Sequence, residues 1–115
     1  MLTSELPIYR DTFELVSLLI DYVAQFPKSH KHTIGQKMTN VSLELFEYLQ
    51  LANRSADDKN TRRRMLEGFL VKFELLNVLV RLCGEKRIVS TKQLARIIGL
   101  TDKIGKQATA WKNKQ

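Results

Sequence analysis

Few residues in this chain are of types and spacings that could do chemistry. His30 and His32 lie two positions apart after a proline, with no cysteine and no carboxylate cluster beside them. Metal sites need more ligands in a defined geometry, so two exposed histidines near a helix start are the simpler interpretation. Asp57 and Asp58 are adjacent in a polar segment, where carboxylates usually form a solvated turn or lie at a helix N-terminus. The sequence therefore predicts no metal site, no cofactor and no paired catalytic carboxylates.

Nucleophiles and phosphate loops are equally sparse. Gly99 and Gly105 lie inside a helical pattern rather than between a strand and a helix, which is where a phosphate-binding loop needs its glycines. No serine or cysteine has an evident histidine partner. The one cysteine, Cys83, lies in an apolar run, which predicts a buried thiol in a reducing, cytoplasmic compartment. We expect a protein that is not an enzyme.

The charge balance carries more information than any single residue. The 115 residues include 19 Lys and Arg against 12 Asp and Glu, which gives a formal net charge of +7 and a pI near 9.8. Such an excess favours polyanionic partners, with nucleic acid first and acidic proteins or anionic membranes after it. The alternative is a protein whose charge serves only its solubility.

Two groups of cations are candidates for contact with phosphates. One is the arginine run at the start of the third apolar segment, where positive charge opposes the helix dipole unless an anion neutralises it. Asp57 and Asp58 are the internal alternative for that role. The other group falls within an arc of about 80° on the last helix, well off its apolar face. The predicted nucleic-acid contacts are Arg62, Arg63, Arg64, Lys92, Arg96, Lys103 and Lys106.

Helical periodicity runs through most of the chain and predicts one all-α domain over residues 1–115. Pro7 suits a first helical position, Pro27 separates two helices, and Gly84 is expected to end a third. Ser90 and Gln93 form a capping-box pattern at the start of the fourth. Short connections predict an antiparallel up-down-up-down four-helix bundle. The expected helices are 7–26, 29–52, 61–83 and 90–112.

The apolar patterns predict how these helices bury their faces. In the first helix one face is expected to comprise Tyr9, Phe13, Val16, Ile20 and Val23, and five further residues widen it into a broad apolar stripe: Leu15, Leu18, Leu19, Tyr22 and Phe26. The third helix is apolar almost all round, which implies a second buried surface, expected here as a subunit interface. A helix central to its own bundle is the alternative. The predicted interface residues are Phe69, Phe73, Leu76 and Val80. No segment has the length and purity of a membrane span, so no membrane partner is expected.

Several short motifs resemble one known family when they are taken in order. The segments 6–9 (LPIY), 26–28 (FPK) and 33–37 (TIGQK), and the later 93–96 (QLAR) and 104–107 (IGKQ) followed by Trp111, resemble the accessory variability determinant family. These proteins are partners of reverse transcriptases in diversity-generating retroelements. The related four-helix proteins encoded in intervening sequences of ribosomal RNA genes share the FPK motif, but the last-helix match favours the first family.

The resemblance implies more than the residues do by themselves. Members form four-helix bundles that assemble as a ring of five around a central channel and are not enzymes. They bind RNA or DNA with little sequence preference and associate with the reverse transcriptase during mutagenic cDNA synthesis. Arg96 and Lys106 lie in matching motifs, so the resemblance places anion binding on them. The alternative is a structural or protein-interaction bundle of the ribosomal intervening-sequence type, without a reverse transcriptase partner.

Overall fold

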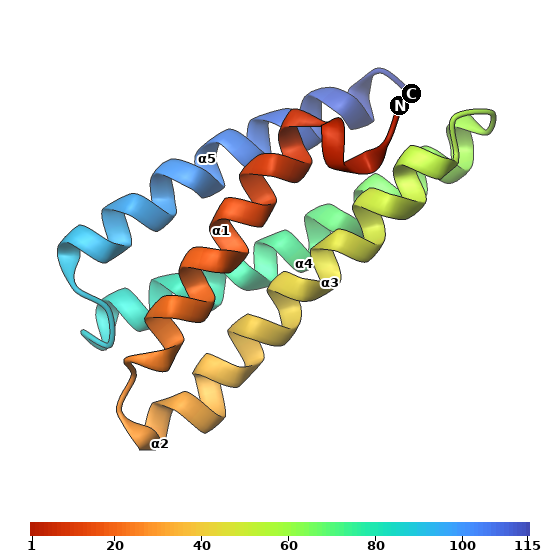
Figure 1. Cartoon of the computed structure of the whole chain (residues 1–115). Coiled ribbons are helices and arrows are strands. Elements are labelled where there is room, and N and C mark those ends of the chain that lie inside the picture. Colours follow the sequence, from red (N-terminus) through yellow and green to blue (C-terminus); the bar gives the residue numbers. More distant parts are fainter.

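Four long helices account for most of the 115 residues, all of which are described by a computed structural model (Figure 1). They are α1 (Pro7–Ala24), α3 (Gln36–Arg54), α4 (Lys59–Glu85) and α5 (Thr91–Asn113). Shorter helical pieces are η1 (Thr3–Glu5), α2 (Lys28–His30) and the π-helical η2 (Lys31–Gly35). No strand is present. The predictions of an all-α chain and of four helices are confirmed.

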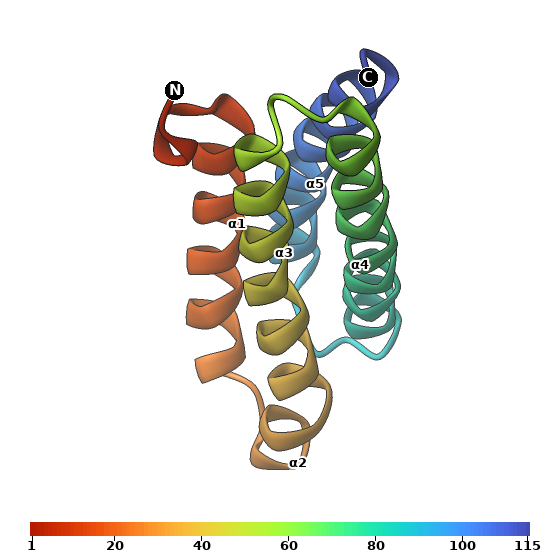
Figure 2. The same cartoon turned by 90° about the vertical axis from the view of Figure 1, so that its right-hand side faces the viewer.

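Each long helix packs against two others, so that the order around the bundle is α1, α3, α4, α5. The connections α1–α3 and α4–α5 lie at one end of the molecule, which we call the α2 end (Figures 1 and 2). The connection α3–α4 and both termini lie at the opposite end. The body measures 46 × 23 × 21 Å, and the helices run along its longest dimension. The molecule therefore has long side surfaces, formed by the helices, and two small end surfaces, formed by the connections and the termini.

Only part of the expected apolar face of α1 is buried. Phe13 and Ile20 were expected in its buried face, but they are 59% and 46% exposed. Leu15 and Leu19, from the widened part of that face, are fully buried, and Val16 and Val23 are buried as expected. The reason is that the apolar stripe of α1 is wider than the arc that α3 and α5 cover, so one edge of it stays outside.

Side-chain caps fix two of the helix starts. The Asp58 carboxylate accepts hydrogen bonds from the Thr61 backbone N–H at 3.1 Å and from its hydroxyl at 2.7 Å. These bonds lower the pKa of Asp58, which acts as the N-cap of α4. At α5 the predicted capping box is confirmed, since Gln93 N–H donates to Ser90 Oγ and Ser90 N–H donates to Gln93 Oε1.

The expected stop at Gly84 is wrong, because α4 continues to Glu85. The left-handed residue of this connection is Arg87, with φ of 57°, while no glycine in the chain has a positive φ. A Cβ at Gly84 would lie 2.8 Å from Leu94 Cδ2 of α5. The glycine therefore serves close packing between α4 and α5 rather than termination.

The expected helix 29–52 is divided in the structure. It begins with α2, passes through the π-helical η2 and continues as α3 to Arg54. A Cβ at Gly35 would lie 2.8 Å from Val23 Cγ1, so this residue lets the chain cross closely over the end of α1. The widened turn and the glycine together place the start of α3 against α1.

Cys83 is fully buried, and its Sγ lies 3.4 Å from Met38 Sδ. Burial raises the pKa of the thiol from 9.0 to about 11. Since the thiolate is the nucleophile, we expect alkylation by iodoacetamide at pH 8 to be far slower in the folded protein than in denaturant. The unfolded chain loses this proton at lower pH than the folded one, so the free energy of unfolding should fall as pH rises from about 9 to about 11. Equal alkylation rates in the two states, measured by mass spectrometry, would contradict the protection of the thiol. Urea unfolding at several pH values between about 8 and about 12 measures the change in stability.

None of the helices combines the length and the apolar composition that a membrane crossing requires.

Candidate nucleic-acid interface

The predicted cations of the last helix form one line on the exposed side of α5, which we call the α5 strip: Lys92, Arg96, Lys103 and Lys106. All four are exposed, and from the first to the last the line extends about 21 Å along the helix axis. Gly99 lies in the same line, and a Cβ there would meet nothing within 4 Å. The strip is therefore open along its length.

Ion pairs engage only part of the strip. Arg96 approaches Glu14 of α1 at 3.9 Å, and Lys106 approaches Asp102 at 3.2 Å. All of these side chains are more than half exposed, so the pairs stabilise the fold little and can be exchanged for phosphate contacts. Lys92 and Lys103 form no ion pair. Over the whole chain only four of the 19 Lys and Arg side chains form one.

The arginine run at the start of α4 is not a single cluster. Arg62 turns inward, and its Nε donates to the carbonyl of Ala52 at 2.9 Å. Its Nη2 donates to the carbonyl of Asn53 at 3.4 Å, and its guanidinium carbon lies 5.4 Å from the ring centroid of Trp111. Arg62 thus joins the end of α3 to the end of α5.

The other two arginines remain on the surface. Arg63 pairs with Glu67 at 3.3 Å, one turn along the helix, and Arg64 donates to the Thr61 hydroxyl at 3.2 Å. Both side chains are exposed. Of the three, these two have guanidinium groups that an external phosphate can reach.

This difference predicts unequal effects on stability. We expect Arg62→Ala to lower the free energy of unfolding by about 2 kcal/mol, because two carbonyl contacts and a cation–π contact are lost together. Arg63→Ala, the matched control one residue away, should change it by no more than about 0.5 kcal/mol. Urea unfolding followed by circular dichroism measures both. Equal effects would contradict the structural role of Arg62.

The residues predicted to face another subunit lie on the other side of α4. Phe69 and Leu76 are 0% exposed, and Phe73 and Val80 are 4% exposed. All four belong to the core of their own bundle, and the rings of Phe69 and Phe73 stack at 5.8 Å. They therefore have no free surface to offer a second subunit. An interface formed by these four residues is therefore excluded, while a subunit interface elsewhere stays a prediction.

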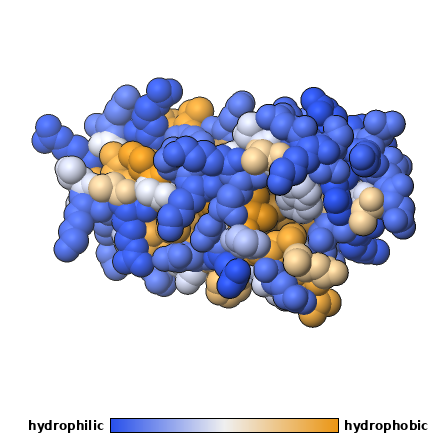
Figure 3. All heavy atoms as spheres, turned by 90° about the horizontal axis from the view of Figure 1, so that it is seen from above, coloured by the Kyte–Doolittle hydropathy of each residue, from blue (hydrophilic) through white to orange (hydrophobic).

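The outer face of α4 carries a second apolar line, which we call the α4 ridge: Val71, Leu75, Val78 and Leu82. Their exposed fractions range from 37% to 66%. Spacings of four, three and four residues put all of them on one side of the helix. This spacing was visible in the sequence, but the apolar residues on the other sides of the helix obscured it. Hydrophobic patches also break the hydrophilic surface in Figure 3.

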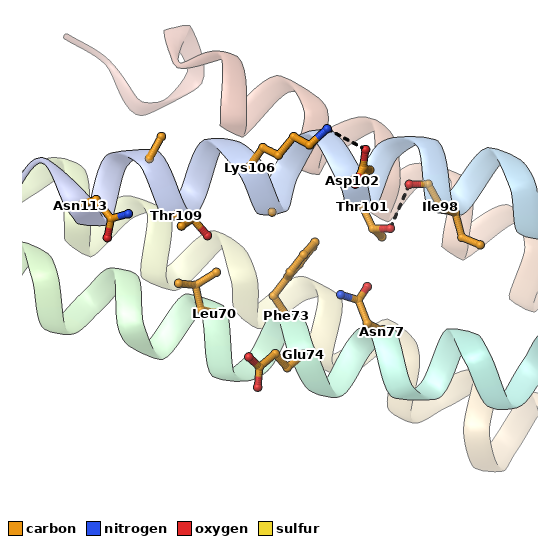
Figure 4. A pocket seen from close by; sticks show the side chains of 12 residues that line it. Leu70, Phe73, Glu74, Asn77, Ile98, Thr101, Asp102, Lys106, Thr109 and Asn113 are labelled. Atoms are coloured by element: carbon orange, nitrogen blue, oxygen red, sulfur yellow. Dashed lines mark hydrogen bonds and ion pairs between the residues drawn. The ribbon is translucent and has the colours of Figure 1, made fainter.

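A groove of about 710 Å³ lies between α4 and α5, next to the ridge (Figure 4). Phe73 of α4 points across its floor toward α5, where a Cβ at Gly105 would lie 3.3 Å from the ring. The α5 side of the groove is low at Gly105 and Ala110, because a glycine has no side chain and an alanine has only a methyl group. The polar side chains along the walls are Asn77, Thr101, Thr109 and Asn113, with Glu74, Asp102 and Lys106 at the rims. An apolar floor with low walls fits a row of side chains from another helix.

The chain shows no arrangement typical of a metal centre. No group of three or more His, Cys, Asp and Glu side chains is close enough together to hold a metal ion. Asp58 is engaged as a helix cap, and the exposed Asp57 has no ion pair. The surface features that remain as candidates for binding include the cations, the α4 ridge and the groove.

Comparison with known proteins gives one result. Searches among curated proteins and among solved structures find no match. A family model described as bAvd-like matches residues 8–115, which include all four long helices except the first residue of α1. This match agrees with the resemblance found in the short motifs. The chain belongs to the bAvd-like family.

Proposed function

We propose that this protein is a non-enzymatic accessory protein that binds nucleic acid and a reverse transcriptase during mutagenic cDNA synthesis in a diversity-generating retroelement. The observation that carries the nucleic-acid part is the α5 strip, four exposed cations in one line with weak or no internal partners. Such a line neutralises phosphates one by one and reads no base, so binding depends on salt and little on sequence.

The nucleic-acid part of this proposal can be tested directly on the wild-type protein. Fluorescence anisotropy with labelled oligonucleotides of arbitrary sequence should show binding that weakens steeply as salt rises. Four neutralised phosphates correspond to a slope of log affinity against log salt of about −3 on single strands and about −4 on duplex. No binding at low salt would refute the nucleic-acid part of the proposal.

The reverse transcriptase partner rests on the family resemblance and needs its own test. A tagged reverse transcriptase from a retroelement in the same genome should retain this protein on an affinity column after nuclease treatment. If nuclease treatment released this protein from the column, nucleic acid alone would join it to the reverse transcriptase, and a direct contact would be contradicted.

The proposal includes self-association as a ring, with five copies expected. The α4 ridge and the α4–α5 groove are different surfaces of the same chain. An interface that joins one to the other is heterologous, and heterologous interfaces close into rings when the rotation allows it. Packing the ridge of one copy into the groove of the next would remove the ridge and the apolar floor of the groove from water.

One observation favours the alternative, a bundle that binds proteins without a reverse transcriptase. Tyr9 and Phe13 of α1 form an aromatic cluster with Phe46 of α3, with ring centroids 5.3 to 6.3 Å apart. Phe13 is largely exposed in it. Exposed aromatic side chains are typical of protein interfaces. Normal oligomer formation without any nucleic-acid binding would support this alternative.

A further inference from the structure

The α2 end carries a second group of cations that lies outside the α5 strip. From residue 22 to residue 43 the chain contains no Asp or Glu, but it contains Lys28, Lys31 and Lys37. The α4–α5 connection brings Lys86 and Arg87 to the same end of the bundle (Figures 1 and 2). We call these five residues the end cluster. The connection itself, residues 86–90, contains no acidic residue, and Glu85 is the last residue of α4 before it.

None of the five cations forms an ion pair within the chain. Four are exposed and Lys31 is half-buried. The backbone beneath them is packed, since Met38 at the start of α3 contacts Cys83 near the end of α4 at 3.4 Å between their sulfur atoms. Val89 joins the same core. The two connections are thus held together as one surface of like charge, which costs free energy unless an anion covers it.

The composition of this surface points to a phosphate chain rather than to a protein. Neither residues 28–37 nor residues 85–90 contain an exposed large apolar side chain. Protein interfaces are built around an apolar or aromatic centre, which is lacking here. Separate cations without such a centre are typical of contacts with a phosphodiester backbone.

Lys92 connects the two groups of cations. It lies in the first turn of α5, directly after the α4–α5 connection, and it is the first residue of the α5 strip. The strip follows the long axis of the body, whereas the end cluster covers a surface across that axis. A strand that contacts both must bend sharply near Lys92.

We propose that the end cluster and the α5 strip form one bent track for single-stranded nucleic acid; this inference rests on the proposed function. A duplex with a persistence length of about 500 Å cannot turn sharply on a body 46 Å long, so it can use only one of the two surfaces. A single strand bends freely and can follow a basic track around the corner. The preferred ligand is therefore a single strand long enough to leave the side of α5 and cross the α2 end.

Two variants with equal loss of charge test the track. The end variant carries Lys28→Gln, Lys31→Gln, Lys37→Gln and Lys86→Gln. The control variant removes four unpaired cations elsewhere, with Arg10→Gln, Arg54→Gln, Lys59→Gln and Arg81→Gln. Labelled single strands of about 8 and about 24 nucleotides and a duplex of about 24 base pairs serve as anisotropy probes. Circular dichroism and light scattering establish that fold and mass are unchanged.

We expect the end variant to bind the long single strand at least about tenfold more weakly than the control variant, with a salt slope smaller by about 3. Binding of the duplex should change equally in the two variants, and the short strand should respond less than the long one. Equal loss for the long strand in both variants would overturn the track while leaving binding by the α5 strip intact. If the end variant also bound the duplex more weakly than the control variant, by the same factor as for the long single strand, the preference for single strands would be overturned. Failure of the wild-type protein to bind any probe would instead refute the proposed function.

Discussion

Reversing the charge of the α5 strip is expected to abolish nucleic-acid binding and leave the fold intact. The variant carries Lys92→Glu, Arg96→Glu, Lys103→Glu and Lys106→Glu. Each substitution changes the net charge by two, so the chain passes from +7 to −1. Four phosphate contacts are lost and four repulsions are gained, which should weaken binding by about 1000-fold or more at low salt. Anisotropy with a labelled single strand measures this loss.

The fold should survive because the four side chains are exposed and contribute little to packing. Glutamate in the first turn of α5, at position 92, is favourable beside the helix N-terminus. At position 106 it faces Asp102 one turn away and at position 96 it faces Glu14 of α1, and each of these repulsions costs about 0.5 kcal/mol. The sum is small enough that far-UV circular dichroism should show unchanged helicity.

A matched control separates the strip from the overall charge. Arg10→Glu, Arg54→Glu, Lys59→Glu and Arg81→Glu change the net charge by the same amount at exposed sites off the strip. If the strip is the contact, this control should retain most of its affinity at moderate salt, where long-range fields are screened. Equal loss in the two variants would show that the general field of the protein, and not the strip, attracts the ligand.

The features that the sequence predicted well are governed by local signals. Pro7 and the capping box of Ser90 and Gln93 place helix starts with little help from the rest of the chain, and the three- and four-residue spacing of apolar residues identifies the segments as helical. The strip on α5 belongs to the same kind, because residues on one helix keep their angular positions wherever the helix lies.

The features that it missed depend on neighbours that lie far apart in the sequence. Arg62 could be recognised as structural only once the turn had brought the carbonyl of Ala52 and the ring of Trp111 to it. Gly84 follows an apolar helical run, which is typical of a helix end, and its contact with Leu94 could not be foreseen because Leu94 lies in another helix. In both cases the local pattern gave the residue its usual role, because it contains no information about a partner in another helix.

The two apolar helices show the limit most clearly. In α1 the apolar stripe was broad, and only the positions of α3 and α5 decide that Phe13 stays outside while Leu15 goes in. In α4 two apolar lines run along opposite sides, and periodicity alone gives no reason to bury the one that contains Phe69 rather than the one that contains Val71. The excess of apolar surface was correctly predicted, but its location was not.

That excess leads to the second large expected effect, on assembly. We expect Val71→Gln, Leu75→Gln and Val78→Gln on the α4 ridge to convert an oligomer into a monomer of 13.3 kDa. These side chains are already exposed in the single chain, and Gln is at least as good a helix former as Val, so the monomer itself should keep its helicity. Size-exclusion chromatography with light scattering measures the mass of both proteins.

The groove supplies the complementary variant. Thr101→Arg and Thr109→Arg place long charged side chains across the α4–α5 groove and should block it without touching the ridge. Alone, this variant should also be monomeric. A control such as Asn40→Arg, at an exposed position of α3 outside both surfaces, should assemble like the wild-type protein.

Mixing the two monomeric variants decides how the surfaces pair. If a ridge enters a groove, the groove variant still offers a good ridge and the ridge variant a good groove, so one copy of each should combine and stop at two chains. If ridges paired with ridges, the mixture would contain only one kind of intact ridge and would form dimers of the groove variant alone. A wild-type protein that is monomeric at micromolar concentration would exclude both arrangements. A one-to-one heterodimer is the expected result, because only a head-to-tail contact leaves a pair of wild-type copies with one unused ridge and one unused groove from which a ring can grow.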